Sequence, residues 1–188
     1  KPFLYASMLD DGELLPNTLI PDIPTQISGY SPQNYNLTYD GAVPASKALS
    51  RSLNIPAVLM LQDYSVNKFY EQLQKLKLKD VNRQPSNYGL SLILGGAESN
   101  LWDLCNSYAY MSSTLNHFNK NNDEYRSNEL TDLNLDFNTK TDFGKPTRQK
   151  NVFGAGAIWQ TFNAMKEVNR PEGDEAWRFY DSSLEIAW

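Results

Sequence analysis

The chain has 188 residues, of which 40% are hydrophobic and 21% charged, and its formal net charge is −5. This composition allows one substantial core, but it provides no cationic face for nucleic acid and no run of the roughly 18 to 20 apolar residues that cross a membrane. Because the sequence has one cysteine and one histidine, an internal disulfide and a zinc-type ligand set are excluded, and we expect no metal and no other cofactor.

Residues 1–12 are typical of the end of a helix, because apolar residues recur until Gly12 stops the pattern. Residues 13–43 contain prolines and glycines spaced among Asn, Tyr and Thr, which predicts an extended, turn-rich loop region instead of regular structure. Long ordered loops of this kind often lie over a site.

Residues 44–115 are expected to form a helical core. A short helix is predicted from Pro44 to Ser52, and a second helix after Asn54, with Pro56 in its first turn, where a missing amide donor is tolerated. The break between these helices therefore falls on the triplet Ser52-Leu53-Asn54.

The core continues with an amphipathic helix over residues 66–78, for which Ser65 is the expected N-cap. Residues 88–94 are short and apolar and lead into a glycine pair that we interpret as a tight strand-to-helix turn. A strong helix is then predicted over residues 100–115.

Residues 116–150 are polar and predict a loop or hairpin insertion, with one exposed strand over residues 133–137. Residues 151–188 predict a helix over 154–168 and then a strand over 184–188. The expected fold class is therefore mainly α with minor β.

The strongest chemical feature is Ser52-Leu53-Asn54, because a hydroxyl and an amide at a helix junction can point into one cleft. A capping break between two helices explains the same triplet, so the pattern alone leaves both readings open. A formal S-x-x-K match at Ser65 and Lys68 is interpreted as a helix cap followed by a solvent-facing lysine.

Two reactive residue types receive structural interpretations. Helical spacing predicts that Cys105 is a small buried side chain and not a nucleophile. His117 follows in the polar stretch and is expected to be a solvated histidine at a helix end.

Several segments together resemble the class A penicillin-binding proteins, bifunctional enzymes that join a glycosyltransferase domain to a serine transpeptidase domain. The matching segments are residues 1–3, 19–25, 30–35, 41–58, 88–98 and 101–104. The resemblance covers residues 1 to about 110 well and 152–188 loosely. It implies that residues 1–188 are part of a transpeptidase domain, namely the helical subdomain of the α+β serine D,D-peptidase and β-lactamase-like fold.

The family surrounds its active site with S-x-x-K, S-x-N and K-T-G motifs. The resemblance implies that Lys1 is the lysine of the first motif and that Ser52 and Asn54 form the second. The nucleophilic serine would precede Lys1 by three positions and K-T-G would follow Trp188, so both lie outside this sequence and the chain alone is expected to be inactive.

In this reading Lys1 is the base, Ser52 relays a proton to the leaving amine, and Asn54 holds Lys1 and binds the substrate backbone. The implied partners are peptidoglycan stem peptides ending in D-Ala-D-Ala, and β-lactam antibiotics. The implied location is the periplasmic face of the bacterial inner membrane, through an anchor outside this sequence. Two alternatives remain: a noncatalytic module that binds cell-wall peptide or a protein partner, and a β-lactamase-type hydrolase.

Overall fold

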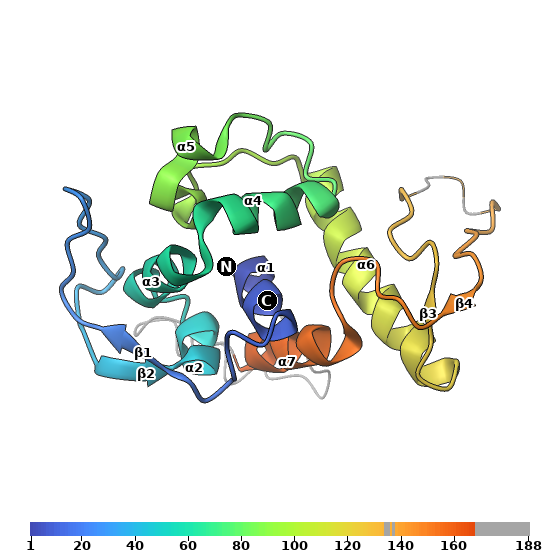
Figure 1. Ribbon diagram of the computed structural model, residues 1–188, viewed down its shortest axis with the longest axis horizontal. Helices are drawn as coiled ribbons and strands as arrows, with labels where there is room; N and C mark the ends of the chain where they lie inside the picture. Colours follow the sequence, from blue (N-terminus) through green and yellow to red (C-terminus); the bar gives the residue numbers. More distant parts are fainter. Residues whose placement is uncertain (134–135, 137, 168–188) are drawn as a thin grey trace, which may run out of the picture.

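A computed structural model describes residues 1–133, 136 and 138–167. This part of the chain is mainly helical with a few short strands, which confirms the expected mainly α class (Figure 1). The elements in chain order are α1 (Pro2–Asp10), β1 (Leu19–Asp22), β2 (Gly41–Pro44), α2 (Ala45–Ser50), α3 (Asn54–Tyr64), α4 (Val66–Lys75), α5 (Pro85–Tyr88), the 3₁₀ helix η1 (Gly89–Leu94), α6 (Leu101–Lys120), β3 (Tyr125–Arg126), β4 (Pro146–Thr147) and α7 (Ala155–Lys166).

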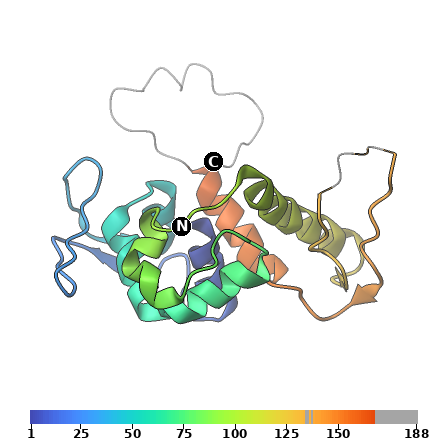
Figure 2. The ribbon, with the colours of Figure 1, turned by 90° about the horizontal axis from the view of Figure 1, so that it is seen from above.

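Helix α1 lies at the centre of the core. Its side chains are apolar on nearly every side, and Leu4, Tyr5 and Ala6 are completely buried. A helix of this composition must be covered on all sides, and α2, α3, α4 and α7 pack around it. Figures 1 and 2 show α7 running beside α1 and α6, so the amino-terminal helix is held by elements from the whole described chain.

Helix α1 ends as the sequence predicts. The amide of Gly12 donates to the carbonyl of Leu9, and that of Glu13 donates to Met8. These two bonds form a Schellman motif, whose left-handed position is usually glycine, and Gly12 has φ +72°.

The prediction that residues 13–43 contain no regular structure is wrong at both ends of that range. Strand β1 pairs antiparallel with β2, with Leu19 opposite Pro44 and Asp22 opposite Gly41. Each strand has only four residues, and the pairing joins segments separated by a long loop, so no local alternation reveals it. The sheet anchors both ends of the loop formed by residues 23–40.

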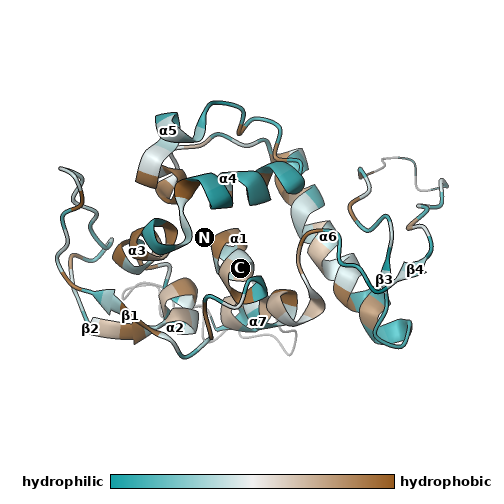
Figure 3. Ribbon diagram, viewed as in Figure 1, coloured by the Kyte–Doolittle hydropathy of each residue, from teal (hydrophilic) through white to brown (hydrophobic). Residues whose placement is uncertain are grey.

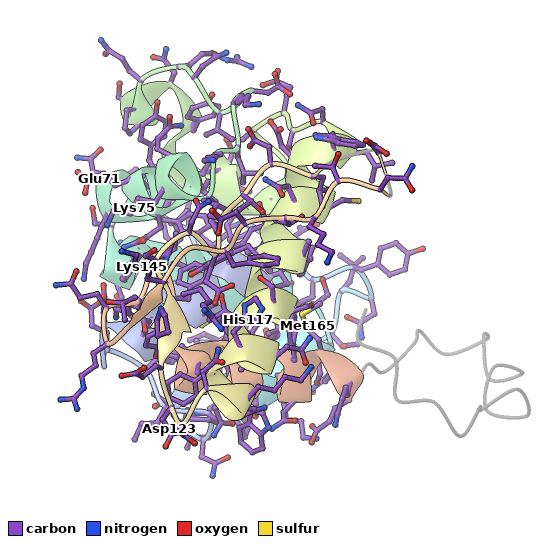
Figure 4. All side chains as sticks on the ribbon, turned by 90° about the vertical axis from the view of Figure 1, so that its right-hand side faces the viewer. Glu71, Lys75, His117, Asp123, Lys145 and Met165 are labelled. Atoms are coloured by element: carbon purple, nitrogen blue, oxygen red, sulfur yellow. The ribbon has the colours of Figure 1, made fainter. Side chains whose placement is uncertain are left out.

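Helix α4 has the predicted amphipathic character. Phe69 and Leu73 are buried, whereas Glu71 and Lys75 are exposed on the polar face, which is visible in Figures 3 and 4. Ser65 occupies the N-cap position but its hydroxyl makes no capping hydrogen bond, because its backbone has φ +83°. Ser65 is therefore at the predicted N-cap position, but the hydrogen bond by which a serine usually caps a helix is not formed.

Several boundaries differ from the sequence prediction. Helix α4 ends at Lys75 and not at residue 78. Residues 88–94 do not form a strand: they complete α5 and form the 3₁₀ helix η1, which Gly95 ends with a left-handed φ of +95°. Helix α6 continues to Lys120, so residues 116–120 belong to it. This last turn is held by packing of Phe118 on Tyr125, with ring centroids 4.9 Å apart.

The remainder of the polar segment contains the short pair β3 and β4, with Tyr125 opposite Thr147. In the predicted strand 133–137, residues 134, 135 and 137 lie outside the described residues, and neither described residue of that range is in a strand. Helix α7 confirms the helix predicted over 154–168. The predicted strand at 184–188 lies outside the described residues. Within the described part of the chain, no helix combines the length and the apolarity that crossing a bilayer requires.

Candidate functional site

Lys1, Ser52 and Asn54 meet at the amino-terminal end of α1. The Nζ of Lys1 donates to Asn54 Oδ1 at 2.6 Å, to the Ser52 carbonyl at 2.7 Å and to Ser52 Oγ at 3.1 Å. Lys1 is the N-cap residue of α1, while the other two residues form the junction between α2 and α3. The structure therefore brings together the three residues singled out from the sequence, with the Lys1 amine bonded to both of the others.

The direction of the Ser52 side chain is set by the way α2 ends. The amide of Ser52 donates to the carbonyl of Leu49, and that of Leu53 donates to Ala48. This is the same Schellman closure that ends α1, with serine at the position that normally takes glycine. Ser52 has φ +52°, a left-handed conformation that is unfavourable for a residue with a Cβ. The strained backbone presents an exposed hydroxyl to Lys1.

Asn54 is held at both its backbone and its side chain. It is the first residue of α3, and its amide donates to Asn34 Oδ1 at 3.0 Å. Its side-chain Nδ2 donates to the carbonyl of Gln33 at 2.8 Å. The amide group is thereby oriented with Oδ1 toward Lys1.

The amine of Lys1 is half-buried in this junction. Burial disfavours the charged form and lowers the pKa of Lys1 from 10.5 to about 8. A lysine with a pKa near 8 has a much larger neutral fraction near neutral pH than an ordinary lysine, although the ammonium still predominates there, and the free lone pair of the neutral form can accept a proton. The site thus combines a proton acceptor, a hydroxyl and a fixed amide.

The second lysine that matches S-x-x-K has the opposite electrostatic environment. Lys68 Nζ lies 2.9 Å from Asp11 Oδ2 and also contacts Glu13. Hydrogen bonds to these two carboxylates raise the pKa of Lys68. Lys68 is therefore held as an ammonium ion, which agrees with its interpretation as a surface lysine and leaves it unsuited to accept a proton.

The predictions for the cysteine and the histidine need correction. Cys105 is exposed, not buried, because the buried side of α6 passes through Asp103, Asn106 and Ser107 instead. His117, labelled in Figure 4, is not simply a solvated helix-end residue: its Nδ1 lies 2.9 Å from Oε2 of the buried Glu129. Neither residue contacts the Lys1 junction.

Asn34 and Asp22 are polar residues near the site that the sequence patterns do not single out. Both are buried polar side chains of the segment between α1 and α2, and Asn34 Nδ2 donates to Asp22 Oδ1 at 2.7 Å. The usable signals are the segments 19–25 and 30–35, which contain Asp22 and Asn34 and carry part of the family resemblance. In the described part of the chain, no group of three His, Cys, Asp or Glu side chains is arranged to hold a metal ion.

The sequence is similar to two curated proteins. It is 38% identical over 108 residues to penicillin-binding protein 1C of Escherichia coli, and 26% identical over 171 residues to penicillin-binding protein 1F of Bacillus subtilis. The matches cover 57% and 89% of this chain but only 14% and 22% of the relatives. No family model matches the chain.

The fold is similar to three solved structures. The transpeptidase (TP) domain of Burkholderia pseudomallei penicillin-binding protein 3 aligns with 92% of this chain and 53% of its own, at a TM-score of 0.66 and 16% identity. A peptidoglycan glycosyltransferase from Burkholderia ambifaria aligns with 90% of this chain and 54% of its own chain, at a TM-score of 0.63 and 15% identity. Penicillin-binding protein 1A of Haemophilus influenzae aligns with 95% of this chain and 31% of its own chain, at a TM-score of 0.62 and 19% identity. At these identities the likeness concerns the fold, and it supports a partial fold of the penicillin-binding type.

Proposed function

Because this chain is homologous to penicillin-binding proteins, we propose that it supplies part of the active site of a serine D,D-transpeptidase in peptidoglycan synthesis. The observation that carries the proposal is the contact of Lys1 Nζ with both Ser52 Oγ and Asn54 Oδ1. The parent protein would act at the periplasmic face of the inner membrane, where stem peptides ending in D-Ala-D-Ala are the substrate.

The proposed reaction needs a base because a serine hydroxyl is a poor nucleophile until its proton is removed. The nucleophilic serine is proposed to precede Lys1 by three positions, which places it one helical turn before the amine. Lys1, with its pKa lowered to about 8, would take the hydroxyl proton as the oxygen attacks the penultimate D-Ala carbonyl carbon.

The tetrahedral intermediate then collapses by breaking the bond to the terminal D-Ala nitrogen. Ser52, within hydrogen-bond distance of Lys1 Nζ, would pass the proton from that amine to the leaving nitrogen, and an acyl-enzyme ester remains. The amine of an acceptor stem peptide then attacks the ester carbonyl carbon. The bond from that carbon to the serine oxygen breaks as the cross-linking amide forms, and the proton lost by the amine would pass through Lys1 to the serine oxygen. Asn54 would hold Lys1 with Oδ1, and the Nδ2 hydrogen that does not bind the Gln33 carbonyl would donate to the substrate backbone.

A β-lactam imitates the D-Ala-D-Ala end and would form the same ester with the serine, so acylation by a fluorescent penicillin tests the proposal. The first step is to read the coding sequence for Ser-x-x before Lys1 and Lys-Thr-Gly after Trp188. The full-length protein is then labelled as wild type, as a variant of the upstream serine and as Lys1→Met.

We expect labelling of the wild type, none of the serine variant, and labelling of Lys1→Met slowed by at least about 100-fold, as is usual for loss of a general base. A correctly folded wild type that is not labelled would contradict the proposal. Binding of D-Ala-D-Ala peptide without labelling would support the noncatalytic module, and release of the intact enzyme from the penicillin adduct within seconds would support a β-lactamase-type hydrolase.

A further inference from the structure

Helix α3 receives its N-terminal cap from a residue far away in the sequence. The residue before its first turn is Leu53, whose side chain has no hydrogen-bond acceptor. Asn34 takes that role: its Oδ1 accepts from the amide of Asn54 at 3.0 Å and from the amide of Ile55 at 3.3 Å. These are two of the donors that the start of a helix leaves unsatisfied.

The orientation of the Asn34 amide is fixed by its other end. Its Nδ2 donates to Asp22 Oδ1 at 2.7 Å and to the carbonyl of Thr38 at 3.0 Å. With oxygen and nitrogen exchanged, the NH₂ group would face the two helix amides and the oxygen would face two acceptors. The contacts therefore permit one orientation only.

Asp22 connects this amide to the sheet. It ends β1, is 1% exposed, and its second oxygen accepts from the amide of Asp40 at 3.0 Å. Asn34 is 2% exposed. The Asp22–Asn34 pair therefore connects strand β1 to the first turn of α3, and both of its side chains are almost completely buried.

The neighbouring residue completes the hold on Asn54. The Gln33 carbonyl accepts from Asn54 Nδ2 at 2.8 Å, while Asn54 Oδ1 accepts from Lys1 Nζ at 2.6 Å. Backbone and side chain of Asn54 are therefore both fixed by residues 33 and 34. This leaves the amide oxygen directed at the lysine.

We propose that Asn34, oriented by Asp22, is a positioning residue that fixes Asn54 against Lys1 for acylation. The inference rests on the proposed function, because it assigns Asn34 a role in the same site. Asn34 would act through Asn54 and would not touch the substrate.

The test uses the full-length protein and the rate of acylation by a fluorescent penicillin, corrected for the folded fraction and measured across the pH range around 8. Asn34→Ala removes the cap, and Asn34→Asp places a carboxylate against Asp22. Combining Asn34→Asp with Asp22→Asn restores a donor and an acceptor between the two positions. Asn36→Ala is the matched control, because Asn36 is an exposed asparagine of the same loop.

We expect Asn34→Ala and Asn34→Asp to slow acylation by roughly 10- to 100-fold, as small misplacements in active sites do. The double variant should recover part of the loss seen in Asn34→Asp, because the bond between positions 22 and 34 returns while the donor to the Thr38 carbonyl does not. Asn36→Ala should stay within about twofold. In Asn34→Ala, a displaced Asn54 no longer accepts from the Lys1 ammonium, so the pH midpoint of acylation should also fall. A residue that only stabilises the fold would lower the folded fraction without moving this midpoint.

The two proposals fail in different ways. A folded wild type that is never acylated overturns the transpeptidase assignment. A wild type that is acylated normally, together with an Asn34→Ala variant of unchanged rate and unchanged pH midpoint, overturns the positioning role alone. A double variant no faster than Asn34→Asp also contradicts it.

Discussion

The Nζ of Lys1 lies 2.6 Å from Oδ1 of Asn54, although the two residues are 53 positions apart. The contact joins Lys1, the residue that directly precedes α1, to Asn54, the first residue of α3. Both helices start at the same place, so the amine lies in a junction of helix ends and not on an open surface. Burial there lowers the Lys1 pKa, while the fixed amide oxygen determines where the amine points.

The backbone of Ser52 gives the first prediction. Ser52→Gly relieves the left-handed strain at φ +52°, so the free energy of unfolding should rise by about 0.5 to 1 kcal/mol. The same variant lacks the hydroxyl that contacts Lys1 and should acylate much more slowly. Urea unfolding and penicillin labelling measure the two effects.

The matched control for Ser52→Gly is Gly12→Ser. Gly12 occupies the same position in the Schellman motif of α1, and a Cβ there meets no atom within 4 Å, so only the backbone conformation matters. Serine at this position should lower the free energy of unfolding by about 1 kcal/mol. Equal stability of Ser52→Gly and wild type, together with a destabilised Gly12→Ser, would mean that the hydroxyl contacts of Ser52 offset its strain.

The pKa of Lys1 gives a pH prediction. Its folded-state pKa is about 8 and its ordinary value is 10.5, so between these values the unfolded chain binds more protons. The free energy of unfolding should therefore rise with pH over this window because of Lys1, whereas below about pH 8 its destabilising effect is complete. Urea unfolding of wild type and Lys1→Met at several pH values isolates this contribution, which should be absent from the variant.

The rate of acylation should also depend on the protonation of Lys1, and it should also rise with pH. The neutral amine is the base, so the rate should rise with pH to a plateau, with a midpoint near 8. A midpoint near the ordinary lysine value would mean that the amine is not desolvated in the working enzyme, and Lys1 would then be excluded as a base prepared by burial.

Lys68 provides a contrasting prediction. Its contacts with Asp11 and Glu13 raise its pKa, so it cannot serve as a base, and Lys68→Ala should leave acylation within about twofold of wild type. Because the ion pairs are solvent-exposed, Lys68→Ala should change the free energy of unfolding little. Acylation reduced as strongly in Lys68→Ala as in Lys1→Met would contradict the assignment of the base.

The features that sequence reasoning predicted are those with local causes. Gly12 ends a helix and Pro56 fits a first turn because of their own backbone chemistry. The features that it missed depend on distant partners: the cap of α3 comes from Asn34, and the pairing of β1 with β2 spans the loop between them. The strained conformation of Ser52 runs against residue preference, and no pattern in the sequence indicates it.

The contact between His117 and Glu129 supports the last prediction. Glu129 is 2% exposed, and its carboxylate accepts from Ser113 Oγ at 3.1 Å and from the amide of Arg126 at 3.1 Å, besides contacting His117. It therefore joins α6 to β3 through one buried acceptor. Glu129→Ala leaves these donors without their partner, which should lower the free energy of unfolding by about 2 to 4 kcal/mol.

Glu129 has no contact with Lys1 or its partners in the described structure, so acylation by the folded fraction should be unchanged. Glu71→Ala is the control, because Glu71 is exposed on α4, and it should stay within about 0.5 kcal/mol of wild type. Unfolding in urea measures the stability of both variants. A Glu129→Ala protein as stable as the control would show that solvent replaces the carboxylate, and that α6 is held to β3 by apolar packing alone.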